Sequence, residues 1–65
     1  MPAVIRFVRG DAIAFEGSAV EVVRALTEAH AGEGRYAVLT ERGSGERIFV
    51  HPDNVVVVRD LPNDA

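Results

Sequence analysis

A single helical pattern, at residues 18–31, is the feature that most limits what this chain can fold into. Ser18 and Glu21 have the spacing of a capping box, in which each side chain accepts a hydrogen bond from the other residue's backbone N–H. Apolar residues then recur at helical spacing, at Ala19, Val22, Val23, Leu26 and Ala29. The pattern predicts one amphipathic helix, followed by Gly32 and Gly34 as left-handed terminators.

The rest of the chain has the pattern of five short strands. Segments rich in β-branched and aromatic residues occupy positions 3–9, 12–16, 35–41, 46–51 and 55–59. Where no helix intervenes, a glycine-containing turn or the Pro52-Asp53-Asn54 sequence separates one strand segment from the next. The order β-β-α-β-β-β predicts an α+β fold, with one helix packed on one face of a small antiparallel sheet. We expect one domain, residues 1–60, and a flexible tail at 61–65.

The turns also predict how the hairpins pair. A three-residue connection at 9–11 places Phe7 opposite Ile13 and Ile5 opposite Phe15. A two-residue connection shifts the register by one residue and separates these large side chains, so the first is preferred.

The second hairpin turns at residues 42–45 and has an even-numbered loop. This loop places Leu39 opposite Ile48, Val38 opposite Phe49 and Tyr36 opposite His51.

Apolar side chains occur on both faces of the expected sheet, whereas one helix covers only one face. The face predicted to meet the helix carries Ile5, Phe7, Ile13, Phe15, Ala37, Leu39, Ile48 and Val50. The opposite face gives a candidate oligomer interface of Val4, Val8, Tyr36, Val38, Phe49, Val56 and Val58. Which of the four consecutive valines at 55–58 face the helix stays open.

The size of the chain favours a partner as well. A domain of 65 residues buries little surface, and without cysteines it has no disulfide to stabilise it. We therefore expect a non-enzymatic protein-interaction module that acts as a homo-oligomer or as a small subunit of a larger assembly. The alternative is a sheet that curls, like a small barrel, and buries both apolar faces in its own core.

The charge of the chain limits the kinds of partner that we expect it to bind. The formal net charge is −3 and every cationic side chain is arginine, so non-specific binding to nucleic acid is not expected. Oligomer symmetry could still concentrate Arg6, Arg35, Arg42 and Arg47 into an anion-binding or nucleic-acid-binding edge, which gives an alternative reading as an oligomeric regulator. A small-molecule sensor with a pocket between subunits is a third reading. The N-terminal sequence has no signal-peptide pattern, so we expect a cytoplasmic protein that does not enter a membrane.

The sequence contains no pattern for catalysis or for a cofactor. Ser18 serves as a cap, and no other hydroxyl has an evident base beside it, so we do not expect an enzyme. His30 and His51, with Asp53 or Glu33 as a third ligand, lack a recognised metal-site spacing, and we expect no metal.

Residues 35–59 resemble parts of two groups of small bacterial proteins. The resemblance lies in the Arg-Gly-Ser-Gly-Glu turn at 42–46 and the Ile-Phe-Val-His-Pro-Asp-Asn-Val-Val-Val-Val run at 48–58. One group is an uncharacterised ββαββ family of high-GC bacteria, in which a similar helix precedes a similar terminal hairpin. The other is a small flagellum-associated family with a strand-Pro-Asp-strand hairpin, in which the helix follows this segment. The resemblance implies a fold and no activity.

Overall fold

The computed structural model describes residues 2–31 and 35–62. Its elements are β1 (Ala3–Phe7), β2 (Ala12–Phe15), α1 (Ala19–Ala31), β3 (Ala37–Thr40), β4 (Arg47–Val50), the 3-10 turn η1 (Pro52–Asn54) and β5 (Val55–Asp60). The predicted α+β fold is confirmed: one helix packs against antiparallel strands in the order β-β-α-β-β-β. Gly32 and Gly34, the predicted terminators, lie outside the described residues, as do the last three residues of the predicted tail.

The capping box at the start of α1 is confirmed. The backbone N–H of Ser18 donates to Oε1 of Glu21 at 2.8 Å, and the backbone N–H of Glu21 donates to Oγ of Ser18 at 3.2 Å. Val22, Leu26 and Ala29 are buried in the core, whereas Val23, predicted for the same face, is exposed. The helix start is also tied to β5, because the backbone N–H of Ala19 donates to Oδ1 of Asp60 at 2.8 Å.

Replacing the cap residue tests this account of the helix start. We expect Ser18→Ala to lower the free energy of unfolding by about 0.5–2 kcal/mol, since the acceptor for the Glu21 N–H is lost. Urea unfolding followed by circular dichroism measures the change. Thr27→Ala is the matched control, because the Thr27 hydroxyl donates only to the Val23 carbonyl within the same helix. Equal losses in the two variants would contradict a special role for the cap.

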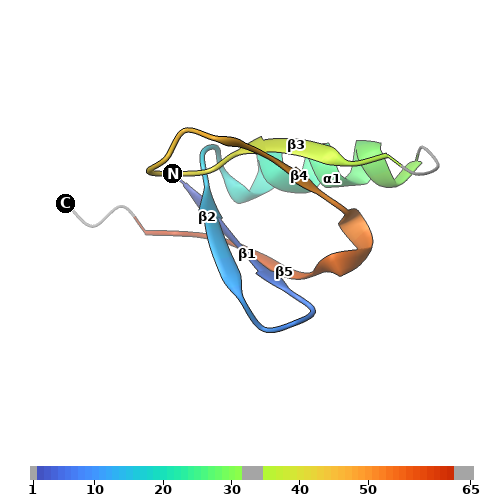
Figure 1. Cartoon of the computed structure of the whole chain (residues 1–65), viewed down its shortest axis with the longest axis horizontal. Coiled ribbons are helices and arrows are strands. Elements are labelled where there is room, and N and C mark those ends of the chain that lie inside the picture. Colours follow the sequence, from blue (N-terminus) through green and yellow to red (C-terminus); the bar gives the residue numbers. More distant parts are fainter. Residues whose placement is uncertain (1, 32–34, 63–65) are drawn as a thin grey trace.

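The five strands form two sheets. One has the strand order β2-β1-β5, and the other is the β3–β4 hairpin. Among residues 2–31 and 35–62, a single bridge between Phe15 and Glu41 joins them. On either side of this bridge the Glu16 N–H donates to the Thr40 carbonyl and the Arg42 N–H to the Ala14 carbonyl, each at 2.9 Å. Figure 1 shows β3 and β4 lying along α1, while β1, β2 and β5 slant away from them.

The first hairpin pairs differently from the prediction. Ile5 lies opposite Ile13, and Ala3 opposite Phe15, so the predicted register was wrong by two residues. The connection does have three residues, but it spans 8–10, closed by a hydrogen bond from the Phe7 N–H to the Asp11 carbonyl at 2.9 Å. The reason is Gly10, whose φ of 100° supplies the left-handed conformation that the third position of such a loop requires. A shift of two residues keeps the odd-numbered side chains on one face, so the residues predicted to face the core still share that face.

The second hairpin has the predicted register. Leu39 lies opposite Ile48, and Val38 opposite Phe49. Tyr36 and His51 also meet as predicted, with ring centroids 5.3 Å apart and nearly perpendicular planes.

The structure also answers which valines of β5 face the core. Val58 lies opposite Ile5, and both Val55 and Val58 pack against the core. A bulge in the β1–β5 ladder leaves Val56 and Val57 exposed. The core consists of Ala3, Ile5, Phe15, Val22, Leu26, Ala29, Ala37, Leu39 and Val50.

Candidate interaction surfaces

The seven residues predicted as an oligomer interface do not share one surface. Tyr36, Val38 and Phe49 lie together at the β3–β4 hairpin, but Val4 belongs to β1, in the other sheet. Val8 and Val56 are exposed near the η1 end of that sheet, where the Val8 N–H donates to the Asn54 carbonyl. Val58, as described above, faces the core, which corrects its assignment to the far face. The residues are separated because the strands form two sheets, whereas the prediction assumed one.

The outer face of the β3–β4 hairpin is the largest of the apolar groups left from that set. We call Tyr36, Val38 and Phe49 the hairpin face. Their exposed fractions are 53%, 47% and 65%. The alternate residues Ala37, Leu39 and Val50 are buried, so the hairpin has one side in the core and an apolar second side.

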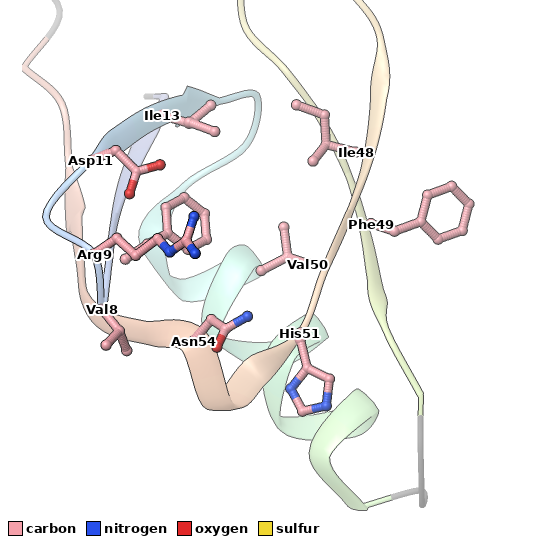
Figure 2. Close-up of a pocket in the computed structure, with 10 residues that line it drawn as sticks. Val8, Arg9, Asp11, Ile13, Ile48, Phe49, Val50, His51 and Asn54 are labelled. Carbon is pink, nitrogen blue, oxygen red and sulfur yellow. The ribbon is translucent and has the colours of Figure 1, made fainter.

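A cleft of about 540 Å³ opens between the β1–β2 hairpin and β4. Phe7, Ile13, Ile48 and Val50 line it with apolar side chains, and Val8 and Phe49 also border it. Its polar lining residues are Arg9, Asp11, His51 and Asn54. Figure 2 shows Ile48 and Val50 pointing from β4 toward the β1–β2 side, while Phe49 points the opposite way. These ten residues include no serine, threonine, cysteine, tyrosine or lysine, so the cleft is lined by no hydroxyl, thiol or amine nucleophile.

One edge of β4 is open. In the sheets formed by the described residues, β4 pairs with β3 along one edge and with no strand along the other. The cleft lies against the face of β4 from which Ile48 and Val50 point toward the β1–β2 hairpin (Figure 2).

The backbone groups at this edge follow from the ladder. The Glu41 N–H donates to the Glu46 carbonyl at 2.8 Å, and antiparallel pairs alternate between bonded and non-bonded. Val38–Phe49 and Thr40–Arg47 are therefore non-bonded pairs, whose N–H and C=O groups point away from the partner strand. The Thr40 carbonyl does point away, since it accepts from the N–H of Glu16, the residue after β2. Arg47 and Phe49 thus present their N–H and C=O groups on the open edge of β4.

His30, His51 and Asp53 come together where the end of α1 meets η1. Nδ1 of His30 lies 3.6 Å from Oδ1 of Asp53, and Nδ1 of His51 lies 4.0 Å from Oδ2 of the same carboxylate. Nδ1 of His51 also accepts from the Asp53 backbone N–H at 3.2 Å, which caps η1. No group of three such side chains within residues 2–31 and 35–62 is arranged to hold a metal ion. Glu33, the alternative third ligand, lies outside this range.

The four arginines of the nucleic-acid alternative are dispersed. Arg42 and Arg47 lie near the turn of the β3–β4 hairpin, and Arg35 precedes the opposite end of β3. Arg6 belongs to the other sheet, opposite Ala12 and Val57. One copy of the chain therefore does not bring them into a single basic patch.

The cleft and the open edge were not predicted from the sequence. Arg9 was assigned to the end of the first strand and to the turn after it, Asp11 to that turn, and Asn54 to another turn. Their approach to β4 depends on how the two sheets are oriented relative to each other, and the local sequence carries no signal for that orientation.

Comparison with protein-family models, curated proteins and solved structures finds no match to this chain. The resemblance of residues 35–59 to the two bacterial groups stays a prediction. Within the part of the chain that the structure describes, no helix has both the length and the apolar character needed to cross a membrane.

Proposed function

We propose that the chain is a non-enzymatic protein-interaction module that self-associates through its β3–β4 hairpin. The observation that carries the proposal is the hairpin face. Phe49 is 65% exposed and lies directly opposite Val38 on the neighbouring strand. Aromatic side chains are enriched at protein interfaces, and clustered exposed apolar groups mark such sites.

The hairpin supports this proposal better than the other exposed apolar residues do. Val20 and Val23 are exposed on a helix among charged residues, and Val8 lies in a turn. Val56 and Val57 are exposed at the bulge in the β1–β5 ladder. The hairpin face instead belongs to a regular, paired element whose other side is fixed in the core. A surface held rigid in this way loses little conformational entropy on binding.

The test is the mass of the particle in solution. We expect sedimentation equilibrium of the wild-type chain to show a mass that rises with concentration from one chain to at least two. Phe49→Glu should raise the dissociation constant by about 30-fold or more, because a central interface residue contributes at least about 2 kcal/mol.

Val20→Glu is the matched control. It makes the same change from an apolar to a charged side chain at a position that is 67% exposed, but on α1. Circular dichroism confirms that both variants are folded. A wild-type chain that stays a single copy to millimolar concentration, or equal weakening by the two variants, would contradict the proposal.

A further inference from the structure

We infer that two copies associate edge to edge, by antiparallel pairing of β4 with the β4 of a second copy, which joins the two hairpins into one four-stranded sheet. The inference rests on the proposed self-association and specifies its geometry. It starts from the open edge of β4, where the ladder with β3 leaves the backbone N–H and C=O groups of Arg47 and Phe49 pointing outward.

The register follows from charge. Hydrogen bonds between two copies must join residues whose backbone groups point outward, which within β4 allows a two-fold axis at Arg47, Ile48 or Phe49. An axis at Arg47 places the two copies of this arginine directly opposite each other, where like charges repel. An axis at Ile48 brings the two copies of Arg47 to diagonal positions, where like charges repel. An axis at Phe49 instead places Arg47 opposite His51 of the second copy, next to the Asp53 carboxylate. Asp53 is exposed, so its carboxylate is accessible to this arginine.

The same register suits the side chains on both faces. The two Phe49 rings become cross-strand neighbours, which partly covers the most exposed aromatic residue of the hairpin face. On the other face, Ile48 of each copy lies opposite Val50 of the other. These side chains point toward the cleft (Figure 2), so the second copy extends its apolar lining.

Amide hydrogen exchange tests the inference residue by residue. The N–H groups of Ile48 and Val50 point to β3 and should be protected at every concentration. The N–H groups of Arg47 and Phe49 should exchange fast in the single chain and at least about 10-fold more slowly in the associated state. In a sample mixing labelled and unlabelled chains, an intermolecular contact between Hα of Ile48 and Hα of Val50 identifies the axis at Phe49.

Two substitutions at position 49 distinguish the contribution of the backbone N–H to association from that of the aromatic ring. Phe49→Ala and Phe49→Pro both remove the ring, but only proline removes the outward N–H, and an edge strand tolerates proline at such a position. We expect Phe49→Pro to weaken association about 10-fold or more beyond Phe49→Ala, since two hydrogen bonds across the axis are lost. Circular dichroism verifies that both variants keep their fold.

The outcomes separate this inference from the proposed function. A chain that never associates contradicts both. If the chain associates while the Phe49 amide still exchanges fast and the two Phe49 variants behave alike, edge pairing is wrong and self-association stands. Val38→Glu then identifies stacking of hairpin faces, because Val38 lies one strand away from the edge and matters strongly only when faces stack.

Discussion

Replacing Phe15 with alanine is expected to remove a large part of the stability of the folded chain. Phe15 is fully buried, and it lies at the bridge to Glu41 that joins the two sheets. Phe→Ala in a core costs about 3–5 kcal/mol, because the lost burial adds to the cavity left behind. A domain of this size has a free energy of unfolding of only about 3–10 kcal/mol. The loss therefore takes most of the stability.

Urea unfolding measures this effect, and Phe49→Ala is the matched control. The chemical change is the same, but Phe49 is mostly exposed. At concentrations where both variants are single chains, Phe49→Ala should change the free energy of unfolding by about 0.5 kcal/mol or less. A Phe15→Ala variant that stays within about 1 kcal/mol of the wild type would show that the sheets are held together elsewhere.

The parts of the fold that were predictable have local causes. The capping box of Ser18 and Glu21 fixes the start of α1 within four residues. The even-numbered loop at 42–45 fixes the second hairpin, and Val38 does lie opposite Phe49. In each case the residues that determine the geometry are close together in sequence.

The errors arise from two different causes. The predicted register of the first hairpin was wrong by two residues. The prediction placed Gly10 in the middle of the loop, whereas the structure has it at the third position. Only the third position needs a positive φ, which Gly10 adopts. That requirement was available from the sequence, because glycine is the residue that meets it without strain.

No local sequence feature of this kind predicts the division of the strands into two sheets. The two sheets meet at the Phe15–Glu41 bridge, where two hydrogen bonds link residues 14–16 with residues 40–42 across the whole of α1, and they separate on either side of it. Because the predicted interface assumed one sheet, Val4, Val8 and Val58 were grouped with Phe49, from which the fold separates them. The cleft beside β4 has the same origin, since it forms where the two sheets diverge.

The stability of a Val22→Asp variant is expected to depend strongly on pH. Val22 is 1% exposed on the face of α1 that packs into the core with Leu26 and Ala29. An ionised carboxylate at this position would be buried without a partner, at a cost of several kcal/mol. At pH 7 the variant should therefore be largely unfolded.

Acid should reverse much of this loss relative to the wild type. Burial disfavours the charged form, so the pKa of the introduced carboxyl is raised in the folded state above its unfolded value of about 4. The penalty is fully present above the raised folded pKa and shrinks as the pH falls through it. Below about pH 4 the carboxyl is neutral in both states, and only the cost of burying a neutral polar group remains.

Urea unfolding of the wild type and the variant at each pH isolates this effect from the protonation of the native carboxylates. Val20→Asp, on the exposed side of the same helix, should follow the wild type throughout. A constant difference between Val22→Asp and the wild type from pH 7 to pH 4 would mean that the carboxylate reaches water. The helix would then leave its place over the core at little cost, and the hairpin face would lose the fixed support on which the proposed self-association depends.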